Sequence, residues 1–298
     1  MIIVVYQDRN LTDKKIIDAT SSVLKGLNNK YNKIHEIIYV EFNNFKLIKC
    51  DYAIIWNVFC KFKQNTLYRK KVDEFQKKNN DKLIVIENGF INRESYFSIG
   101  YDHISNFGNY PKFPYNEDRL KKLDLRIKNM IYKTNMNKNI LFCTQLPWDT
   151  QVQDVDYSKW IIDTINILKK HTKRQIVIRK HPKSRPKNGF DYFDNSFFKK
   201  NNLDVIISDK SIEDDFKNSY CVIAFNSTIL VDAVINGIPV LSGSETSIVN
   251  DICIKDISTV ENLNKFSNED IKKCLSLVAY KQWNLDEISQ GIPFDYYI

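Results

Sequence analysis

A β-strand, a helix and a second β-strand follow one another in the stretch Val222-Ile-Ala-Phe-Asn226-Ser227-Thr228-Ile-Leu-Val-Asp232-Ala-Val-Ile-Asn-Gly237-Ile-Pro239-Val240. The β-branched run at its start is typical of a buried strand, and Gly237 and Pro239 end the helix and open the next strand. Units of this kind build parallel sheets, so the stretch predicts an α/β fold.

Two hydroxyl residues, Ser227 and Thr228, stand with Asn226 at the point where that helix begins. The free N–H groups and partial positive charge of a helix N-terminus attract an anion. A plain N-cap role explains a hydroxyl at this place equally well. Asp232 follows about one turn later, where its carboxylate could accept hydrogen bonds from ribose hydroxyls. The turn therefore predicts a phosphate site, with helix capping as the alternative.

The same alternation of strands and helices runs along the whole chain. Nine β-branched runs, the first at Ile2 and the last ending at Leu241, alternate with helix-length segments, which favours parallel sheets with helices on both faces. An aromatic-rich loop punctuated by Gly and Pro interrupts the pattern between Asn88 and Pro114. We expect two Rossmann-like domains facing a cleft, residues 1–137 and 138–298. The helical segments after residue 268 either cap the second domain or pack back on the first.

The composition is that of a folded, soluble protein. Of the 298 residues, 43% are hydrophobic, and 44 basic against 36 acidic side chains give a formal net charge of +8. No apolar run approaches the ~18 residues of a membrane span, and the first strand lacks the features of a signal peptide. The six cysteines are scattered without C-x2-C spacing, so we expect no metal site and free thiols in a reducing cytoplasm. The absence of G-x-G-x-x-G and G-x-x-x-x-G-K-[ST] argues against an NAD-linked dehydrogenase or a P-loop NTPase.

The densest positive charge follows a strand in Gln175-Ile-Val-Ile-Arg179-Lys180-His181-Pro182-Lys183-Ser184-Arg185. Nine Lys or Arg residues and no acid lie between residues 169 and 187. Arg179 can hold two anion oxygens in fork geometry, and His181 and Lys183 can donate to a phosphate. Because ligands bind at the carboxyl ends of parallel strands, this turn predicts an anion site. A solvated basic turn is the alternative.

A polar loop that contains Gln145 and Asp149 follows the strand expected at residues 140–143. The polar composition of this loop is weak evidence for a ligand site, since loops between strands and helices are often polar. Its position is stronger evidence, because this loop, the basic turn and the hydroxyl turn all leave the carboxyl ends of strands in one predicted domain. We therefore expect the three loops to converge on one crevice.

Carboxylates in the first half of the chain are candidates for a general base. Glu87 ends a predicted strand, Asp102 lies in the aromatic-rich loop, and Asp8 follows the first strand. Deprotonating an alcohol requires a positioned acceptor within hydrogen-bond reach, which any of the three could supply. A surface or capping role is equally compatible with each.

Taken together, these motifs resemble GT-B glycosyltransferases. Two branches are similar: phage-encoded DNA-modifying glycosyltransferase-like proteins and, more distantly, capsule polysaccharide Kdo transferases, which share the order Q-x-x-x-D, H-P and S-[ST]. The match covers about residues 82–241 and rests on Ile86-Glu87-Asn-Gly-Phe90, Tyr96-Phe-Ser-Ile-Gly-Tyr-Asp102, Glu117-Asp118-Arg119, Gln145-Leu-Pro-Trp-Asp149, Arg179-Lys-His181-Pro182, Asn226-Ser227-Thr228 and Gly237-Ile-Pro239.

The resemblance implies that the second domain holds a nucleotide-sugar donor and the first an acceptor. It implies no metal and no permanently bound cofactor, with a UDP-sugar as donor and a CMP-sugar as the alternative. Asp232 stands where the family often has Glu. The catalytic base would be Glu87 or Asp102, and the donor contacts would be Gln145, Asp149, Arg179, His181, Lys183, Asn226, Ser227, Thr228 and Asp232.

The excess positive charge lies in the first predicted domain. Residues 1–137 hold 24 basic and 15 acidic side chains, a net charge of +9, whereas residues 138–298 carry −1. Clustered positive charge attracts a phosphate backbone, and aromatic rings can stack on an extruded base. The side chains expected to bind the acceptor are Lys61, Lys63, Arg69, Lys70, Tyr96 and Tyr101, and Lys71, Lys77 and Lys78 extend the same basic stripe.

Three functions are compatible with these observations. The lack of a membrane-anchoring helix, the compact size and the aromatic loop favour transfer of a sugar to a 5-hydroxymethylpyrimidine or related base in phage-type duplex DNA. Charge alone does not separate DNA from an acidic polysaccharide. The expected location is the cytoplasm, which is the host's if the protein is phage-encoded. The alternative enzyme is a capsule or surface polysaccharide glycosyltransferase of the Kdo transferase kind. The third hypothesis is a nucleotide- or DNA-binding module without catalysis. The sequence does not indicate an oligomeric state.

Overall fold

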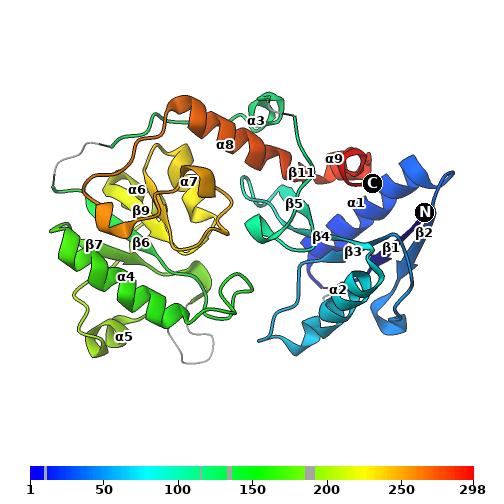
Figure 1. The fold of residues 1–298 in the computed structure, drawn as a ribbon, viewed down its shortest axis with the longest axis horizontal. Helices are drawn as coiled ribbons and strands as arrows, with labels where there is room; N and C mark the ends of the chain where they lie inside the picture. The colour runs from blue at the N-terminus through cyan, green and yellow to red at the C-terminus, as the bar shows by residue number, and fades with distance from the viewer. Residues whose placement is uncertain (10–11, 115, 133–135, 185–191) are drawn as a thin grey trace. The chain divides into compact units, whose positions relative to one another are not determined.

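Two compact units make up the chain in the computed structural model (Figure 1). The structure describes residues 1–9, 12–114, 116–132, 136–184 and 192–298. The first unit is Met1–Leu123 together with Ser276–Ile298, and the second is Asp124–Leu275. Each unit contains one β-sheet and its own helices, which confirms the mixed α/β class with two sheets.

The first unit is built on a six-stranded sheet. Its helices and strands are β1 (Ile2–Tyr6), α1 (Lys14–Tyr31), β2 (Glu36–Val40), β3 (Tyr52–Trp56), α2 (Leu67–Asn79), β4 (Lys82–Asn88), β5 (Tyr96–Tyr101), α3 (Asp118–Lys122), β11 (Gln282–Asn284), α9 (Leu285–Ser289) and α10 (Phe294–Tyr297). The strand order is β11-β5-β4-β3-β1-β2. Strands β4, β3, β1 and β2 are parallel, whereas β5 is antiparallel to both β4 and β11.

Helices of this unit cover both faces of the sheet. α1 begins at Asp13, whose side chain accepts a hydrogen bond from the N–H of Lys15, and its apolar residues recur every three or four positions on the side that packs against the sheet. α2 buries Val72 against the opposite face. Val4 and Ile54 of the central strands are at most 1% exposed, which explains why these strands are continuous apolar runs.

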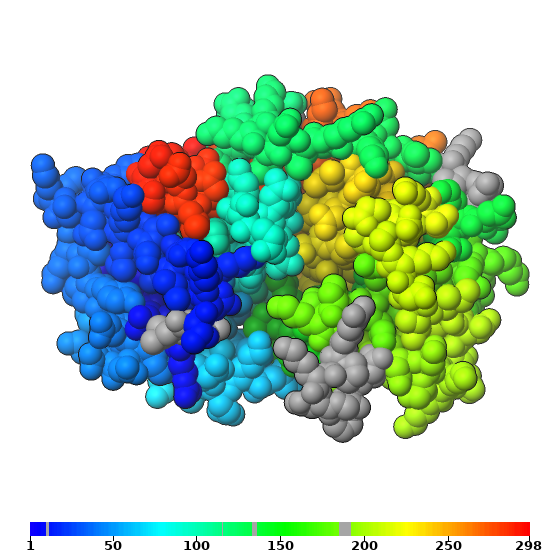
Figure 2. All heavy atoms as spheres, turned by 180° about the vertical axis from the view of Figure 1, so that it is seen from behind, coloured from blue at the N-terminus to red at the C-terminus, as the bar shows by residue number. Residues whose placement is uncertain are grey.

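The C-terminal segment completes the first sheet. β11 pairs with β5, with Gln282 opposite Ser98, and α9 packs along α1. Figure 2 shows the red C-terminal residues against the blue N-terminal ones. A Cβ on Gly26 of α1 would lie 2.0 Å from the carbonyl oxygen of Ile288, so the close approach of the two helices requires glycine there. The sequence left open whether this segment caps the second domain or packs back on the first, and in the structure residues 276–298 belong to the first unit.

A buried ion pair fastens the C-terminal segment. Both Nη atoms of Arg119 donate to the carboxylate of Glu287 at 3.0 Å, and Nε and Nη2 donate to the carbonyl oxygens of Ala279 and Gln282 at 3.1 and 2.7 Å. The guanidinium lies 3.7 Å from the centre of the Trp283 ring. Burial alone would raise the pKa of the Glu287 carboxyl, but the hydrogen bonds and charge of Arg119 outweigh burial and lower it. This network ties α3 to the segment about 160 residues later.

The second unit is built on a five-stranded parallel sheet. Its helices and strands are β6 (Asn139–Cys143), α4 (Tyr157–His171), β7 (Ile176–Arg179), α5 (Asn195–Lys200), β8 (Ile206–Ile207), α6 (Ile212–Lys217), β9 (Ser219–Ala224), α7 (Ile229–Ile235) and β10 (Val240–Ser242). The strand order is β10-β9-β6-β7-β8. The division between the units falls within α8 (Asn268–Tyr280). α4 and α5 pack into one core with the strands, and α7 buries its apolar side on the sheet as well.

The first boundary between the units lies after Leu123, whereas the sequence predicted one at residue 137. The segment in question is joined to the second unit by backbone hydrogen bonds, from Lys128 N to Ile235 O at 2.9 Å and from Ile131 N to Gly237 O at 3.0 Å. The sequence placed the boundary at the polar residues 133–139 because local polarity does not reveal such distant partners. A second boundary exists because the C-terminal segment returns to the first unit.

Two local elements also differ from the sequence-based expectation. The region between residues 88 and 114 was expected to be a loop, but it contains β5, which hydrogen-bonds to strands on both sides. Residues 116–132, one of the helix-length segments that the sequence predicts between strands, are helical only in α3. The hydrogen bonds of Lys128 and Ile131 to the second unit use backbone groups that a continued helix would need for itself.

The structure also describes the cysteines, the helix lengths and the possible metal ligands. All six cysteines are buried free thiols. Over the described ranges, no helix is long and apolar enough to cross a membrane. The same residues contain no group of three or more His, Cys, Asp or Glu side chains that could hold a metal ion.

We expect Arg119→Met to destabilise the first unit by about 3–5 kcal/mol, because it leaves the Glu287 carboxylate and two carbonyl oxygens buried without their partner. Lys122→Met is the matched control, since Lys122 is 64% exposed and its Nζ lies 3.7 Å from the same carboxylate. The control should stay within about 0.5 kcal/mol of wild type. Urea denaturation followed by tryptophan fluorescence measures both, and equal effects would contradict the assignment.

The same pair gives stability a pH dependence. The pKa of Glu287 is lower in the folded protein than its usual value of 4.5, so its contribution is fully present above about pH 4.5 and is lost as the pH falls through the folded value. The difference in unfolding free energy between wild type and Arg119→Met should therefore shrink below pH 4.5. A difference that stays constant from pH 7 to pH 3 would contradict this mechanism.

Candidate functional site

The carboxyl ends of the second sheet's parallel strands bring the predicted donor loops to one edge. β6, β9 and β7 are neighbours in the sheet, and the loops with Gln145, Asn226 and His181 leave their carboxyl ends. β10 is the next strand beyond β9, so its loop lies at the same edge. Crevices that bind ligands in open α/β sheets lie at such edges.

A reciprocal pair of amides joins two of these loops. Gln145 Nε2 donates to Asn226 Oδ1 at 3.0 Å, and the backbone N–H of Asn226 donates to Gln145 Oε1 at 3.1 Å. The two residues are only 5% and 3% exposed. The backbone N–H of Gln145 donates to the hydroxyl of Tyr157 at 2.7 Å, and burial raises the pKa of that phenol. Gln145 and Asn226 were expected to contact the nucleotide-sugar donor. In the structure they hydrogen-bond to each other and hold together the loops after β6 and β9.

A set of hydroxyls stands beside this amide pair. Asn226 Nδ2 donates to Thr246 Oγ1 at 2.8 Å, and Thr246 Oγ1 lies 2.7 Å from Ser244 Oγ. Ser227 and Thr228 are half-buried at the start of α7, and the N–H of Ile229 donates to Ser227 Oγ at 3.4 Å. Thr228 has no side-chain capping bond to α7, so its hydroxyl is not explained as an N-cap.

Ser244 and Thr246 were missed in the sequence analysis. They lie in Ser242-Gly-Ser-Glu-Thr-Ser247, directly after the strand that Gly237-Ile-Pro239 opens. The signal was available, because this loop also leaves the carboxyl end of a parallel strand and is rich in hydroxyls. A half-buried hydroxyl pair held by Asn226 can donate to and accept from a polar ligand.

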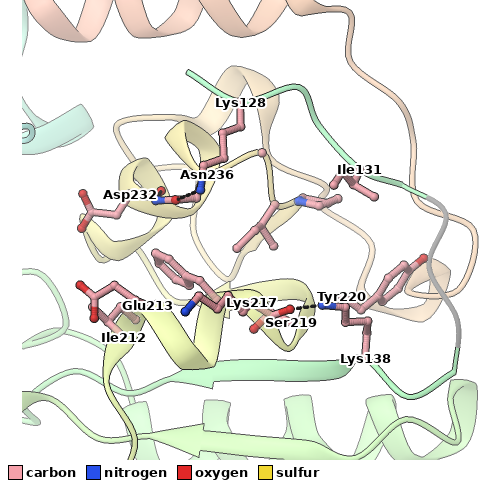
Figure 3. A pocket seen from close by; sticks show the side chains of 14 residues that line it. Lys128, Ile131, Lys138, Ile212, Glu213, Lys217, Ser219, Tyr220, Asp232 and Asn236 are labelled. Carbon is pink, nitrogen blue, oxygen red and sulfur yellow. Dashed lines mark hydrogen bonds between the residues drawn. The ribbon is translucent and has the colours of Figure 1, made fainter. Parts of the chain in front are cut away.

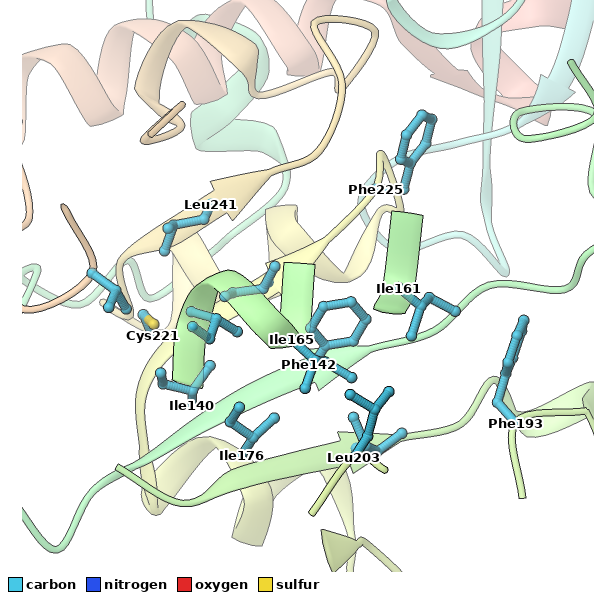
Figure 4. Packing of buried hydrophobic residues seen from close by; sticks show 14 of the residues in the cluster. Ile140, Phe142, Ile161, Ile165, Ile176, Phe193, Leu203, Cys221, Phe225 and Leu241 are labelled. Atoms are coloured by element: carbon cyan, nitrogen blue, oxygen red, sulfur yellow. The ribbon is translucent and has the colours of Figure 1, made fainter. Parts of the chain in front are cut away.

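Aromatic packing holds the hydroxyl loop in place. A Cβ on Gly243 would lie 2.4 Å from the Trp160 ring, so glycine lets that ring pack directly against the loop backbone. Trp160 in turn stacks on Tyr157 with ring centres 5.5 Å apart and meets Phe225 edge-on at 5.1 Å. Figure 4 shows Phe225 above the core formed by Phe142 and Ile161. The site edge is therefore built on a close-packed core.

The basic turn after β7 presents a histidine whose tautomer can be inferred. His181 is half-buried, and its Nδ1 accepts a hydrogen bond from the N–H of Lys183 at 3.1 Å. Because Nδ1 accepts, the proton of the neutral ring is on Nε2, which makes Nε2 a donor. Lys183 is exposed in the 3-10 turn Pro182–Ser184. Arg185, the last basic residue of the predicted motif, lies outside the described residues.

Arg179 is held by an acid of its own unit. Its Nη1 donates to Asp215 Oδ2 at 2.7 Å and to the carbonyl oxygen of Lys210 at 2.9 Å, and Ser208 Oγ donates to the other carboxylate oxygen. The Asp215 side chain is 3% exposed. Arg179 thus ties β7 to α6. This partner was missed in the sequence because it lies 36 residues away.

Asp149 and Asp232 take different places. Asp149 is half-buried in the loop after β6, where its Oδ1 accepts from the N–H of Gln151 at 2.9 Å. Asp232 lines a groove of about 730 Å³ together with Glu213 of α6 (Figure 3). That groove is also lined by Ser219 and Pro239, at the starts of β9 and β10, so it lies toward the opposite edge of the sheet. The structure therefore does not bring Asp232 together with the other expected donor residues.

The two carboxylates expected as base lie at opposite ends of β4. Glu87 is half-buried at the carboxyl end, and its Oε1 accepts from Asn88 Nδ2 at 2.9 Å. The backbone N–H of Asp102 donates to the carbonyl oxygen of Leu83, four residues earlier, or about 13 Å along the strand. Glu87 therefore shares the edge formed by the carboxyl ends of β1 and β3, and Asp102 does not.

Asp8 and Arg69 are buried partners in the first unit. Arg69 Nη2 forms an ion pair with Asp8, Nη1 donates to the carbonyl oxygen of Val58 at 3.1 Å, and the hydroxyl of Tyr68 donates to Asp8 at 2.5 Å. Asp8 is 3% and Arg69 is 8% exposed. Because its carboxylate is buried and bound by Arg69 and Tyr68, Asp8 is not assigned as a general base. Arg69 is not part of a surface stripe, because its charge is neutralised inside the protein.

Of the remaining acceptor candidates, Tyr101 packs inside the first unit, Tyr96 is half-buried, and the lysines are exposed. Tyr101 packs its ring against Tyr297 with centres 5.1 Å apart, and its hydroxyl donates to the carbonyl oxygen of Tyr297, so it supports the C-terminal segment. Tyr96 is half-buried opposite Asn284 of β11. Lys61 and Lys63 are exposed. Helix α2 carries exposed Lys71 and Lys78, while two other lysines meet acids one turn away, Lys70 with Glu74 at 3.7 Å and Lys77 with Asp73 at 2.7 Å.

The charge asymmetry also changes with the observed boundaries. The first unit contains 22 basic and 17 acidic residues, a formal charge of +5. The second contains 22 basic and 19 acidic residues, a formal charge of +3. The basic residues of segment 124–137 belong to the second unit, and the acidic C-terminal segment belongs to the first. The contrast of +9 against −1 is therefore a property of the expected boundary and not of the folded units.

Comparison with solved structures shows a likeness of fold. No family model matches the sequence, and no curated protein matches it. Among solved structures, the chain is similar to the β-Kdo 2,7-transferase of Thermosulfurimonas dismutans KpsC, with a TM-score of 0.50 and 13% identity over 99% of both chains. The β-Kdo 2,4-transferase of the same protein gives 0.49 and 11% identity over 81% of this chain and 79% of that one. UDP-GlcNAc 2-epimerase of Methanocaldococcus jannaschii, in complex with UDP-GlcNAc and UDP, gives 0.33 and 11% identity over 98% and 97%. At 11–13% sequence identity, these similarities concern the fold of the chain and not its activity.

Gln145→Glu tests whether the amide pair supports the edge. The new carboxylate would face Asn226 Oδ1, an acceptor, and replace a hydrogen bond by a repulsive contact. We expect a loss of about 1–3 kcal/mol in the unfolding free energy of the second unit. Gln64→Glu, at an exposed position of the first unit, is the control and should be near neutral. Thermal and urea unfolding measure both, and a stable Gln145→Glu protein would argue against the role.

Proposed function

We propose that the protein transfers a glycosyl group from a nucleotide sugar to a hydroxyl group of an acceptor. The observation that carries the proposal is the edge of the second sheet formed by the carboxyl ends of its strands. There the amide pair holds the hydroxyls of Ser244 and Thr246, and the turns with Ser227 and His181 leave strands of the same sheet. Similarity of the whole chain to a structure titled a Kdo transferase supports it. Such an edge offers many neutral donors and acceptors, which suits the phosphate and hydroxyl groups of a nucleotide sugar.

Different residues of the second unit have different tasks in this proposal. His181 Nε2 and Lys183 donate to phosphate oxygens of the donor, and Ser227 and Thr228 add hydroxyl donors at the start of α7. Asp149 borders this site. Gln145, Asn226 and Arg179 act as positioning residues, because their polar atoms bind neighbouring loops. Asp232 lies by the groove toward the other edge, so we do not assign it a ribose contact.

Glu87 is the proposed base in the first unit. Its carboxylate takes the proton of the acceptor hydroxyl as the acceptor oxygen forms a bond to the anomeric carbon of the sugar. The bond between that carbon and the phosphate oxygen breaks, and the nucleotide leaves with the bonding electrons. His181 and Lys183 stabilise the negative charge that develops on the departing phosphate. The donor is a nucleotide sugar, UDP-linked as the first expectation and CMP-linked as the alternative.

A saccharide hydroxyl is the acceptor class that we favour. The hypothesis of a 5-hydroxymethylpyrimidine in DNA rested on compact size, the lack of a membrane-anchoring helix and aromatics that could stack on a base, with positive charge that an acidic polysaccharide would share. The units carry similar charge and Tyr101 packs on Tyr297, so neither the charge nor this ring favours DNA.

The acceptor can be identified directly with labelled donors. Purified protein is incubated with UDP-, GDP- and CMP-linked sugars and either an oligosaccharide or duplex DNA, plain or containing 5-hydroxymethylpyrimidine. Label on the oligosaccharide is the expected result. Label only on modified DNA would overturn the saccharide proposal and restore the DNA hypothesis. No label, and no thermal shift with any nucleotide sugar, would reject glycosyl transfer in favour of a module without this activity.

Glu87→Gln and Asp102→Asn distinguish the two carboxylates. Removing the base should lower kcat about 10²–10⁴-fold in Glu87→Gln with little change in the KM for donor. Asp102→Asn should stay close to wild type, because Asp102 is at the other end of β4 and asparagine tolerates its φ of +64°. Steady-state kinetics at saturating donor measure both variants. The reverse pattern would assign the base to Asp102.

A further inference from the structure

One row of side chains crosses three strands of the first sheet next to the proposed base. Glu87 of β4 is paired with Ser98 of β5, and Ser98 is paired with Gln282 of β11. Residues directly opposite one another in antiparallel strands point to the same face of the sheet. Glu87 and Gln282 therefore lie on one face at one end of the sheet, although 195 residues separate them in the sequence.

The Gln282 side chain binds the backbone that follows Glu87. Its Oε1 accepts from the N–H groups of Phe90 and Ile91 at 2.7 and 2.9 Å, and its Nε2 donates to the carbonyl oxygen of Ile91 at 3.1 Å. Gln282 is 0% exposed, and Phe90 and Ile91 are 5% and 2% exposed. All three backbone groups are thus satisfied by one amide from the C-terminal segment rather than by water.

The sequence around Glu87 is adapted to this contact. A Cβ on Gly89 would lie 2.8 Å from the carbonyl oxygen of Tyr96 and 3.0 Å from Gln282 Oε1, so glycine opens the space for the amide. The N–H of Gly89 donates to Tyr96 O at 2.7 Å. The loop is therefore fixed on both sides, by β5 and by Gln282, within two to four residues of Glu87.

Gln282 is itself held in place. Its carbonyl oxygen accepts from Arg119 Nη2 at 2.7 Å, and Arg119 is bound to Glu287. Its backbone pairs with Ser98 in the sheet. Two contacts of its backbone therefore determine where Gln282 lies, so its amide can impose a position on the loop rather than follow it.

We infer that Gln282 is a positioning residue for Glu87, and that the C-terminal segment supplies part of the acceptor-activating machinery. The inference rests on the proposed function, in which Glu87 removes the acceptor proton. A general base acts only within hydrogen-bond reach of its proton, and a misplacement of about 1 Å can cost about 100-fold in rate. Gln282 fixes the strand end and loop that carry Glu87 and thereby the position of its carboxylate.

Three variants test the inference. Gln282→Leu removes all three hydrogen bonds. Gln282→Glu keeps acceptors for the N–H groups of Phe90 and Ile91 but loses the donor to Ile91 O. The matched control is Gln290→Leu, at an exposed glutamine of the same C-terminal segment. Gln282→Glu keeps the test informative if Gln282→Leu does not fold.

Hydrogen exchange and kinetics are measured on all three full-length proteins. We expect faster amide exchange at Phe90 and Ile91 and a kcat lowered about 100-fold in Gln282→Leu, with a smaller loss in Gln282→Glu and none in Gln290→Leu. The KM for the nucleotide sugar should not change, because its proposed contacts lie in the second unit. The acid limb of the pH profile of kcat, which reports the base, should shift only in the Gln282 variants.

The outcomes separate this inference from the proposed function. Faster exchange with unchanged kcat and pH profile would overturn the inference, because Gln282 would then hold the loop without affecting the base. Unchanged exchange at Phe90 and Ile91 would overturn it as well. A wild-type protein that transfers no sugar from any donor would overturn the proposed function and the catalytic part of the inference, while the exchange data would still decide whether Gln282 holds the loop.

Discussion

The ion pair between Arg119 and Glu287 is the interaction on which the first unit depends. It binds a segment that is far away in sequence, and the same guanidinium binds the carbonyl oxygens of Ala279 and Gln282. Burying two charges adds little net stability, but separating them inside the protein is costly. The pair therefore favours the observed position of the C-terminal segment, because removing either partner there would leave the other charge buried alone. The sixth strand of the sheet, β11, belongs to this segment and also pairs with β5.

Buried amides organise both candidate edges. In the second unit, Gln145 and Asn226 bind each other and fix the loops after β6 and β9. In the first unit, Gln282 satisfies three backbone groups after β4. An amide suits this task because it donates and accepts at once and costs less to bury than a charge. Side chains with reactive or charged ends can then lie next to a support that is neutral and hydrogen-bonded through both its oxygen and its nitrogen.

Local patterns predicted the fold class and the loops at the site, whereas partners distant in sequence could not be predicted. The α/β class followed from runs of β-branched residues, and the loops of Gln145, His181 and Asn226 do leave the carboxyl ends of parallel strands. β5 was missed because Gly and Pro around it resemble loop chemistry, although hydrogen bonds to β4 and β11 decide its conformation. Arg69 and Arg179 were interpreted as ligand contacts because their acids, 61 and 36 residues away, cannot be identified without the fold.

The acceptor illustrates why charge counted along a sequence is weak evidence for a partner. Moving the boundary from residue 137 to residue 123 transfers Arg126, Lys128 and Lys133 to the second unit, and the returning segment brings Asp286, Glu287 and Asp295 to the first. Charges that remain are partly compensated at short range, as in the pairs of α2, and salt screens the rest beyond about 10 Å at 0.1 M ionic strength. Long-range attraction of a polyanion therefore does not distinguish the two units. In the mechanism that we propose, acceptor selection therefore comes from hydrogen bonds and shape near Glu87, whose backbone is held by Ser98 and whose following loop is held by Gln282.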